Sequence, residues 1–233
     1  NIMSRFFWLA IYLLGLSVYS ENSFSWGGRG HHTICDAAVF LVKEPGLKEY
    51  LQNKPFMMGH LCNVPDFYWK SLGGEANSLG NSTHFIDVEI TGMKIKEVPT
   101  DYNKIISDFT GKENQIEKGM TIKSVPFEFG SNWWRADQFY RLAIKNGEIA
   151  KSSAAPTNKK EEQDDTLAYN KAAFEMVVAM GLMGHFVGDN AQPFHVSVDY
   201  DGYLSGHGGI HAYYEDSIVA NQPYNLQAMV VEK

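Results

Sequence analysis

The sequence is poor in cysteine: a chain of 233 residues contains two, Cys35 and Cys62. A pair this sparse forms no recognisable disulfide framework. One disulfide between the two residues and two separate small buried side chains fit the sequence equally well. The sequence therefore leaves their pairing open.

Positive charge is also scarce: the chain contains 20 Lys and Arg residues and 27 Asp and Glu residues, which gives a net charge of -7. A broad nucleic-acid-binding face is not favoured, because such a face needs a local excess of Lys and Arg. Phosphate esters are not excluded as substrates, since bound cations can outweigh a modest negative surface charge.

The first 25 residues contain an apolar run from Phe6 to Tyr19. At about 14 residues it is shorter than the roughly 20 that a membrane-spanning helix needs. Arg5 precedes this run and the small-residue junction Ser23-Phe24-Ser25 follows it, which is typical of a secretory signal peptide. We therefore predict a signal peptide over residues 1–25, cleavage before Trp26, and a secreted or periplasmic protein.

Strand-like alternation and internal repeats are not found in the sequence, whereas apolar residues recur at helical spacing. The pattern predicts helices at His31–Val42, Leu47–Gln52, Asp101–Glu117, Ser131–Asn146 and Thr166–Val187. Lys54–Asn81 is predicted to be irregular and Lys151–Asp165 to be an exposed loop. Because helices dominate this pattern, we expect a mainly α fold. The length and the 44% of hydrophobic residues are enough for a single helical domain over residues 26–233.

Histidine is sparse, but two of the eight histidines lie in one short run, HFVGDNAQPFH, from His185 to His195. On a helix, His185 and Asp189 share a face because they are four residues apart. His211 and Glu215 repeat this spacing shortly afterwards. A single histidine is most often a hydrogen-bonded core or surface residue, but five matched imidazole and carboxylate groups indicate metal binding.

Further short motifs accompany this run: SWGGRGH at the predicted mature N-terminus, Pro65-Asp66, and THFID over residues 83–87. Together, the motifs resemble the superfamily of bacterial zinc-dependent phospholipases C and S1/P1-type nucleases. The resemblance spans Trp26 to Glu215 in the same order. It is specific as a set, although each motif by itself is weak. It implies a helical fold and three zinc ions.

The resemblance also implies which residues bind each ion. The first ion would be held by Asp66, His84, His185 and Asp189. The second would be held by His195, His211 and Glu215. The third would be held by His31, by Asp189 as a bridge, and by the free α-amino group and carbonyl of Trp26. His32, His60 and His207 have no position in the motifs.

Cleavage before Trp26 would complete the third site, because a free amine can bind zinc and an amide nitrogen cannot. Without the resemblance, Trp26 would be interpreted as an aromatic residue at the start of the domain.

Clustered zinc ions suit the hydrolysis of a phosphodiester by an activated water. Asp66 is the candidate catalytic residue for orienting or deprotonating that water, with a purely structural ligand role as the alternative. Asp87 could hydrogen-bond the substrate, hydrogen-bond a ligand histidine, or cap local structure.

The motifs contain evidence for each of two enzyme classes with different substrates, the nucleases and the phospholipases C. The compact WGGRGH motif favours the nucleases. Glu215, the connection of about 15 residues between His195 and His211, and the aromatic run Phe67-Tyr68-Trp69 in place of an arginine favour the phospholipases. Aromatic faces such as those of Phe67 and Tyr68 can bind a quaternary ammonium group, although they can equally stack on a nucleobase or pack in the core.

We therefore predict a phospholipase C that acts on phosphatidylcholine-like lipids at a membrane surface. The alternatives are an S1/P1-type nuclease acting on single-stranded DNA or RNA, and a secreted zinc-binding protein without catalysis. No obligate protein partner is evident. The chain ends soon after Glu215, without the further helices usual in this superfamily, so residues 26–233 are expected to be a shortened or C-terminally incomplete domain.

Overall fold

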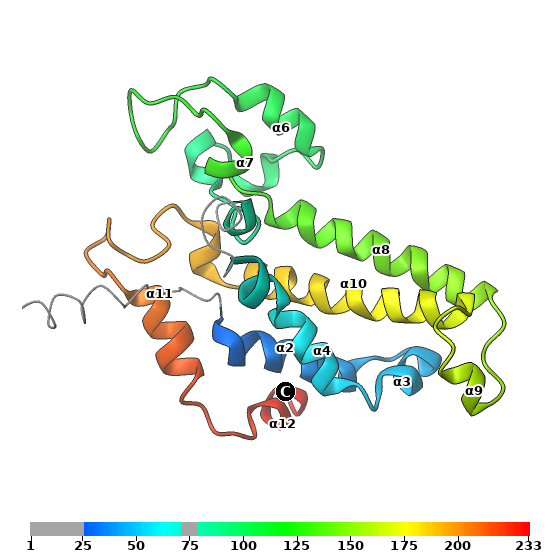
Figure 1. Cartoon of the computed structure of the whole chain (residues 1–233). Helices are drawn as coiled ribbons and strands as arrows, with labels where there is room; N and C mark the ends of the chain where they lie inside the picture. The colour runs from blue at the N-terminus through cyan, green and yellow to red at the C-terminus, as the bar shows by residue number, and fades with distance from the viewer. Residues whose placement is uncertain (1–25, 71–78) are drawn as a thin grey trace, which may run out of the picture.

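Two long helices, α8 (Asn132–Ser152) and α10 (Ala168–Asn190), run side by side through the protein (Figure 1). The computed structural model describes residues 26–70 and 79–233. Within these ranges the protein is a mainly α single domain without strands, with two isolated β-bridges, which confirms the predicted fold class. The predicted signal peptide lies outside the described residues.

Helix α10 is the central element of the core. Its apolar second half lets it pack against α8 on one side and against α2 and α4 on another. Among the helices described, α10 is long and apolar enough to cross a membrane, judged by length and composition only. About half of its apolar window, 56%, is buried inside the protein, as expected of a core helix.

Helices α2 (Gly27–Leu41), α3 (Pro45–Leu51) and α4 (Pro55–Val64) form a layer on α10, and the π-helix η1 (Pro65–Lys70) continues α4. A disulfide joins Cys35 of α2 to Cys62 of α4 and answers the question of their pairing. Around this disulfide lies an apolar cluster that includes Val39, Leu51 and Met58.

The predicted irregular segment Lys54–Asn81 is wrong over residues 55–70 and 79–81, which are helical, while residues 71–78 lie outside the described residues. Pro55 starts α4 at a position where the missing N–H is tolerated. Helix α4 contacts both α2 and α10, so its apolar residues are not confined to one stripe. The periodicity that identifies an amphipathic helix is therefore weak here.

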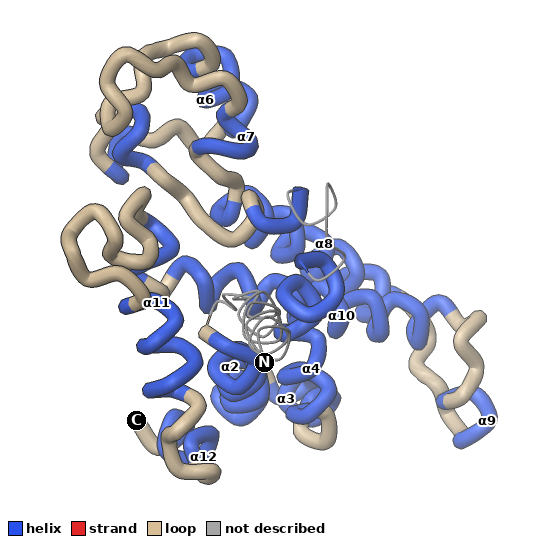
Figure 2. Tube along the Cα trace, turned by 60° about the vertical axis from the view of Figure 1, so that its left-hand side comes forward, coloured by secondary structure: helices blue, strands red, loops and turns tan. Residues whose placement is uncertain are grey.

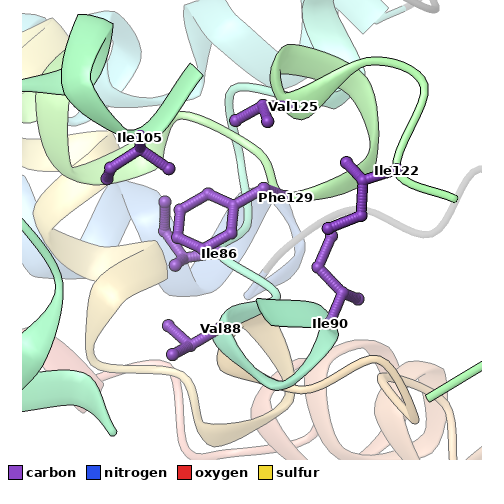
Figure 3. Close-up of a cluster of buried hydrophobic side chains, with 7 residues drawn as sticks. All are labelled: Ile86, Val88, Ile90, Ile105, Ile122, Val125 and Phe129. Atoms are coloured by element: carbon purple, nitrogen blue, oxygen red, sulfur yellow. The ribbon is translucent and has the colours of Figure 1, made fainter. Parts of the chain in front are cut away.

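Between η1 and α8 the chain forms a second lobe from η2 (Val88–Thr91), η3 (Ile95–Glu97), α6 (Tyr102–Phe109) and α7 (Val125–Glu128). The lobe has its own apolar core, which includes Ile86, Val88 and Phe129 (Figure 3). Ile86 of the THFID motif is part of this core, so the core holds the end of the motif in place.

The predicted helix Asp101–Glu117 is wrong beyond Phe109. Gly111 has a φ of 81°, which interrupts the helix. The side-chain oxygen of Asn114 accepts hydrogen bonds from the backbone N–H groups of Ile116 and Glu117, at 2.9 and 3.0 Å. These contacts form a turn where the apolar pattern favoured a helix.

After α10 the chain forms only short elements: η4 (Pro193–Val196), α11 (Ile210–Ala212), η5 (Tyr213–Val219) and α12 (Leu226–Val231). A short helix α9 (Lys159–Glu162) lies in the predicted loop that precedes α10. Figure 2 shows α12 returning beside α2. Arg29 of α2 donates to the carbonyls of Ala220 and Gln222, so α2 anchors the C-terminal segment.

Candidate metal centre

Eight buried side chains around the end of α10 form three groups that could each hold a metal ion. The ligand atoms within each group lie within 4.8 Å of one another. The groups are His31, His185 and Asp189; Asp66, His84 and His185; and His195, His211 and Glu215. The structure thus brings together every side chain that the motifs suggested as a ligand.

Asp189 lies between the groups and presents its two carboxylate oxygens to different neighbours. Oδ1 is 3.2 Å from Nε2 of His31 and 3.6 Å from Nδ1 of His195. Oδ2 is 3.0 Å from Nδ1 of His84 and 3.3 Å from Nε2 of His185. Asp189 is therefore placed as a bridge between adjacent positions.

Asp66 lies in the first turn of η1 and is fully buried. Its Oδ1 is 3.6 Å from Nδ1 of His84 and 3.9 Å from Nε2 of His185, and its Oδ2 is 3.8 Å from Nε2 of His31. Because π-helical turns are rare and frequently occur at functional sites, this turn is consistent with a functional role for Asp66.

The third group is built from the short elements that follow α10. Nε2 of His211 lies 2.8 Å from Oε1 of Glu215 and 3.1 Å from Nε2 of His195. Glu215 lies in η5, which is also a π-helix. The buried side chain of Gln192 donates to the same Oε1 at 2.6 Å and holds Glu215 in place.

The donor set fits divalent cations in composition and distance. Around a tetrahedral zinc ion, neighbouring N and O ligands are roughly 3.3 Å apart, and the closer ligand pairs at this site lie near that separation. Burial, followed by the neighbouring His185, lowers the pKa of His31 and favours its neutral, metal-binding form. Oε2 of Glu215 is buried without a hydrogen-bond partner among the described residues.

Charge also favours cations. Burial by itself would raise the pKa of Asp189, but nearby imidazoles, above all His185, hold it well below its usual range. Three buried carboxylates face histidines here, and the ion pairs of the described site include no Lys or Arg. Bound cations would balance this charge.

Backbone carbonyls fix the tautomers of two histidines. Nδ1 of His185 is 2.7 Å from the carbonyl oxygen of Cys62, and Nδ1 of His195 is 2.7 Å from the carbonyl oxygen of His84. A carbonyl can only accept, so each Nδ1 carries the proton and each Nε2 keeps a lone pair for a metal.

Close approach of α2 to α10 places His31 in the site. A Cβ added to Gly188 would lie 3.1 Å from Ile34 and 3.2 Å from the His31 ring, so any larger residue there requires these side chains to shift. The indole N–H of Trp26 donates to the carbonyl of Gly188 at 2.7 Å. The Trp26 side chain therefore contacts α10 at Gly188, the residue before Asp189, while ligation by the Trp26 α-amino group stays a prediction.

A cavity of about 340 Å³ opens beside the metal groups. It is lined by Asn81, His84, Phe85, Asp87, Phe194, His195, Val198, Tyr200 and His211. Burial, followed by the nearby Glu89, raises the pKa of Asp87 to about 7. The cavity therefore offers aromatic faces and one carboxyl group next to the ligand histidines.

The aromatic residues after Asp66 lie elsewhere. Phe67 and Tyr68 are not among the residues that line this cavity. The Phe67 ring covers Gly28 closely enough that a Cβ there would lie 2.5 Å from it. Tyr68 is 53% exposed, and its ring contacts His60. Their proposed contact with substrate stays a prediction.

Residue patterns did not identify Gln192, Phe85, Phe194 or Tyr200 as site residues. Gln192 and Phe194 are part of the run HFVGDNAQPFH, and Phe85 is part of THFID, so position within the motifs was the available signal. Tyr200 lies in a glycine-rich loop without such a signal. His32, His60 and His207 belong to none of the three groups found among the described residues.

Comparisons of the chain with protein-family models, curated proteins and solved structures found no match. The resemblance to the phospholipase C and S1/P1 superfamily therefore rests on the residue motifs. The structure supports the broader description of a mainly helical protein with buried His, Asp and Glu groups that could bind metals.

Proposed function

We propose that the protein is a zinc-dependent phosphodiester hydrolase. The observation that carries this proposal is the position of Asp189, whose two oxygens face different ligand groups and would hold ions side by side. Imidazole and carboxylate together suit zinc. When bound, clustered zinc ions polarise phosphoryl oxygens and lower the pKa of a coordinated water toward about 7.

The protein's own groups supply positioning and proton transfer. Asp66 is the proposed catalytic residue, which orients the attacking water or accepts its proton, because its carboxylate is buried among three imidazoles. Gln192 and the carbonyls of Cys62 and His84 hold the ligands in fixed orientations.

A phosphatidylcholine-like lipid is the proposed substrate. Phe85, Phe194 and Tyr200 give the cavity aromatic faces, and Asp87 adds a carboxyl group. Aromatic faces attract a quaternary ammonium group through cation–π interactions. The disulfide between Cys35 and Cys62 is compatible with action outside the cytosol, in a secreted or periplasmic protein.

A second candidate function, hydrolysis of single-stranded nucleic acid, is favoured by the same cavity in one respect. Asn81 and Asp87 could hydrogen-bond the edge of a base, while Phe85 or Phe194 could stack on its face. A secreted zinc-binding protein without catalysis would have the ligand groups but no hydrolytic activity.

A chromogenic phosphodiester tests the proposed activity. The mature protein should hydrolyse it, lose the activity in EDTA and regain it with zinc. His211→Ala should reduce the rate roughly 100-fold or more, because it removes a ligand, whereas the matched control His60→Ala, an exposed histidine outside the ligand groups, should not. Equal rates for these two variants would contradict the proposal. Phosphatidylcholine and single-stranded DNA then separate the two substrates.

A further inference from the structure

The loop of residues 199–209, which connects η4 to α11, exposes apolar side chains beside the metal groups. Tyr203 is 70% exposed and Leu204 is 75% exposed. Tyr200, which is also exposed, lines the cavity. A single exposed leucine is ordinary on a protein surface. Three exposed apolar or aromatic side chains within five residues, one of which lines the cavity, indicate a surface with a function.

Hydrogen bonds within the loop fix this exposure. The carboxylate of Asp199 accepts from the backbone N–H groups of Leu204 and Ser205 at 2.8 and 2.9 Å. Gly202 has a φ of 77°, and a Cβ there would lie 2.6 Å from the carbonyl oxygen of His207. The loop is thus a folded unit that presents Tyr203 and Leu204 outward.

The loop is also tied directly to the ligand groups. Asp201 Oδ1 accepts from the backbone N–H of His211 at 3.0 Å. The ring of Tyr200 meets the ring of His211 edge to face, with centroids 6.0 Å apart. The carboxylates of Asp199 and Asp201 therefore accept from backbone amides, and the tip of the loop, residues 202–206, contains no ionisable side chain other than that of Tyr203.

The sequence on both sides of this tip is poor in positive charge, which disfavours some partners. Residues 172–232 contain no Lys or Arg, while acidic residues occur throughout the segment. Nucleic acids and anionic lipid surfaces are bound largely through Lys and Arg. A zwitterionic bilayer has no net surface charge, so it neither requires these cations nor repels the acidic chain.

We infer that Tyr203 and Leu204 insert into the headgroup region of a zwitterionic, phosphatidylcholine-rich bilayer and seat the cavity against the lipid surface. Tyrosine favours this interfacial depth, and insertion of leucine removes apolar surface from water. The inference rests on the proposed function, because it assumes that the substrate is a phosphatidylcholine-like lipid, which the protein would reach within a bilayer.

Cosedimentation of the mature protein with phosphatidylcholine vesicles tests this docking surface. EDTA in the buffer prevents hydrolysis. Leu204→Ser should lower the apparent affinity for vesicles roughly tenfold, and addition of Tyr203→Ser should lower it further. The matched control is Phe56→Ser, since Phe56 is 74% exposed at the start of α4, which lies away from the loop in Figures 1 and 2.

A separate assay with a soluble chromogenic phosphodiester and zinc keeps the two proposals distinguishable. Loss of vesicle binding in Leu204→Ser but not in Phe56→Ser supports the docking surface, whatever the soluble rate. Equal vesicle binding by wild type and Leu204→Ser would overturn it. Binding of single-stranded DNA in place of vesicles, weakened by Tyr203→Ser, would overturn it in favour of a nucleic acid. Absence of soluble hydrolysis would contradict the proposed function only.

Discussion

Asp189 contacts more of the candidate ligands than Glu215 does. It is fully buried, and four imidazoles lie within 3.6 Å of its two oxygens. Glu215, by contrast, serves one group through Oε1. A bridging carboxylate that holds two cations contributes to both sites. Loss of Asp189 should therefore weaken metal binding more than loss of Glu215.

We predict that Asp189→Asn damages the protein more than Glu215→Gln. The first variant should lose about two bound zinc ions and the second about one, because an amide carries no charge to balance the cations. The rate on a soluble phosphodiester should fall at least about tenfold further in Asp189→Asn. Elemental analysis and initial rates measure both effects, with the exposed Glu117→Gln as control. Equal losses of zinc would show that Asp189 is not a bridge.

Asp87 makes stability depend on pH. Its pKa is raised to about 7 by burial, followed by Glu89. Between about pH 4 and 7 the folded protein therefore keeps a proton that the unfolded chain has released. This contribution favours the folded state less and less as the pH rises through that range, and the ionised carboxylate is a cost above it.

Asp87→Asn should therefore stabilise the metal-free protein at pH 8 and have little effect near pH 4. We expect a gain of roughly 1–2 kcal/mol, reduced from the full shift because Asp87 is only partly buried. Urea unfolding in EDTA at the two pH values measures the difference between wild type and variant. A gain of the same size at both values would mean that the titration of Asp87 is not its source.

Single residues also show what residue types at fixed spacing could predict. The pairs His185–Asp189 and His211–Glu215 could be identified because a helix brings positions four apart together. Gln192 could not, since a glutamine in a turn has no pattern of its own. Its role follows from the hydrogen bond to Glu215, which is visible only in the folded chain.

Among the elements, α2 and α4 are held together by the Cys35–Cys62 disulfide. His31 lies one turn before Cys35 on α2, and the carbonyl of Cys62 orients His185. The crosslink therefore joins two helices that each position a ligand, so its loss should affect both stability and metal binding.

The double variant Cys35→Ser/Cys62→Ser should lower the free energy of unfolding by about 3 kcal/mol, the value expected when a loop of this length is no longer closed. It should also bind zinc more weakly, because His31 and His185 lose a constraint. Chemical denaturation and competition with a zinc chelator measure the two effects. A reductant should weaken the wild type in the same way and leave the variant unchanged. Full zinc affinity in the variant would separate the disulfide from the metal centre.

Elements were predictable where they are long. Helices α8 and α10 follow the predicted ranges apart from their ends, because they extend over 21 and 23 residues, although α10 packs against other helices on two sides. Helix α4 was missed because it has only ten residues and contacts helices on two sides, and the expected helix after Phe109 was stopped by local turn hydrogen bonds. Both failures come from contacts that periodicity does not describe.

For the whole molecule, the site depends on bringing distant parts of the chain to the end of α10. His31, Asp66 and His84 come from the first half of the sequence, while His195 and Glu215 follow α10. Composition and periodicity predicted the fold class, but they did not predict this convergence. The motif resemblance grouped the ligands because it retains information about spatial arrangement that periodicity lacks.

The maturation state of the chain gives the last prediction. The indole of Trp26 donates a hydrogen bond to the carbonyl of Gly188, the residue before Asp189, and Trp26 precedes the helix that carries His31. If the mature chain starts at Trp26, its free α-amino group can join His31 and Asp189 around one ion. In an uncleaved chain the same nitrogen is an amide, whose lone pair is delocalised and cannot bind a metal. The precursor should therefore bind one zinc ion more weakly and hydrolyse a phosphodiester more slowly.

Two purified versions test this, one starting at Trp26 and one with Ser25 retained as the first residue. The first should hold three zinc ions and the second about two after equal dialysis, because only the Trp26 amine differs between them. Thermal unfolding in EDTA is the control: it should be nearly the same for both, since the indole hydrogen bond and the helix are unchanged. If the extended version binds three zinc ions and turns over as fast as the shorter one, Trp26 is a packed aromatic residue, and cleavage has no part in assembling the metal centre.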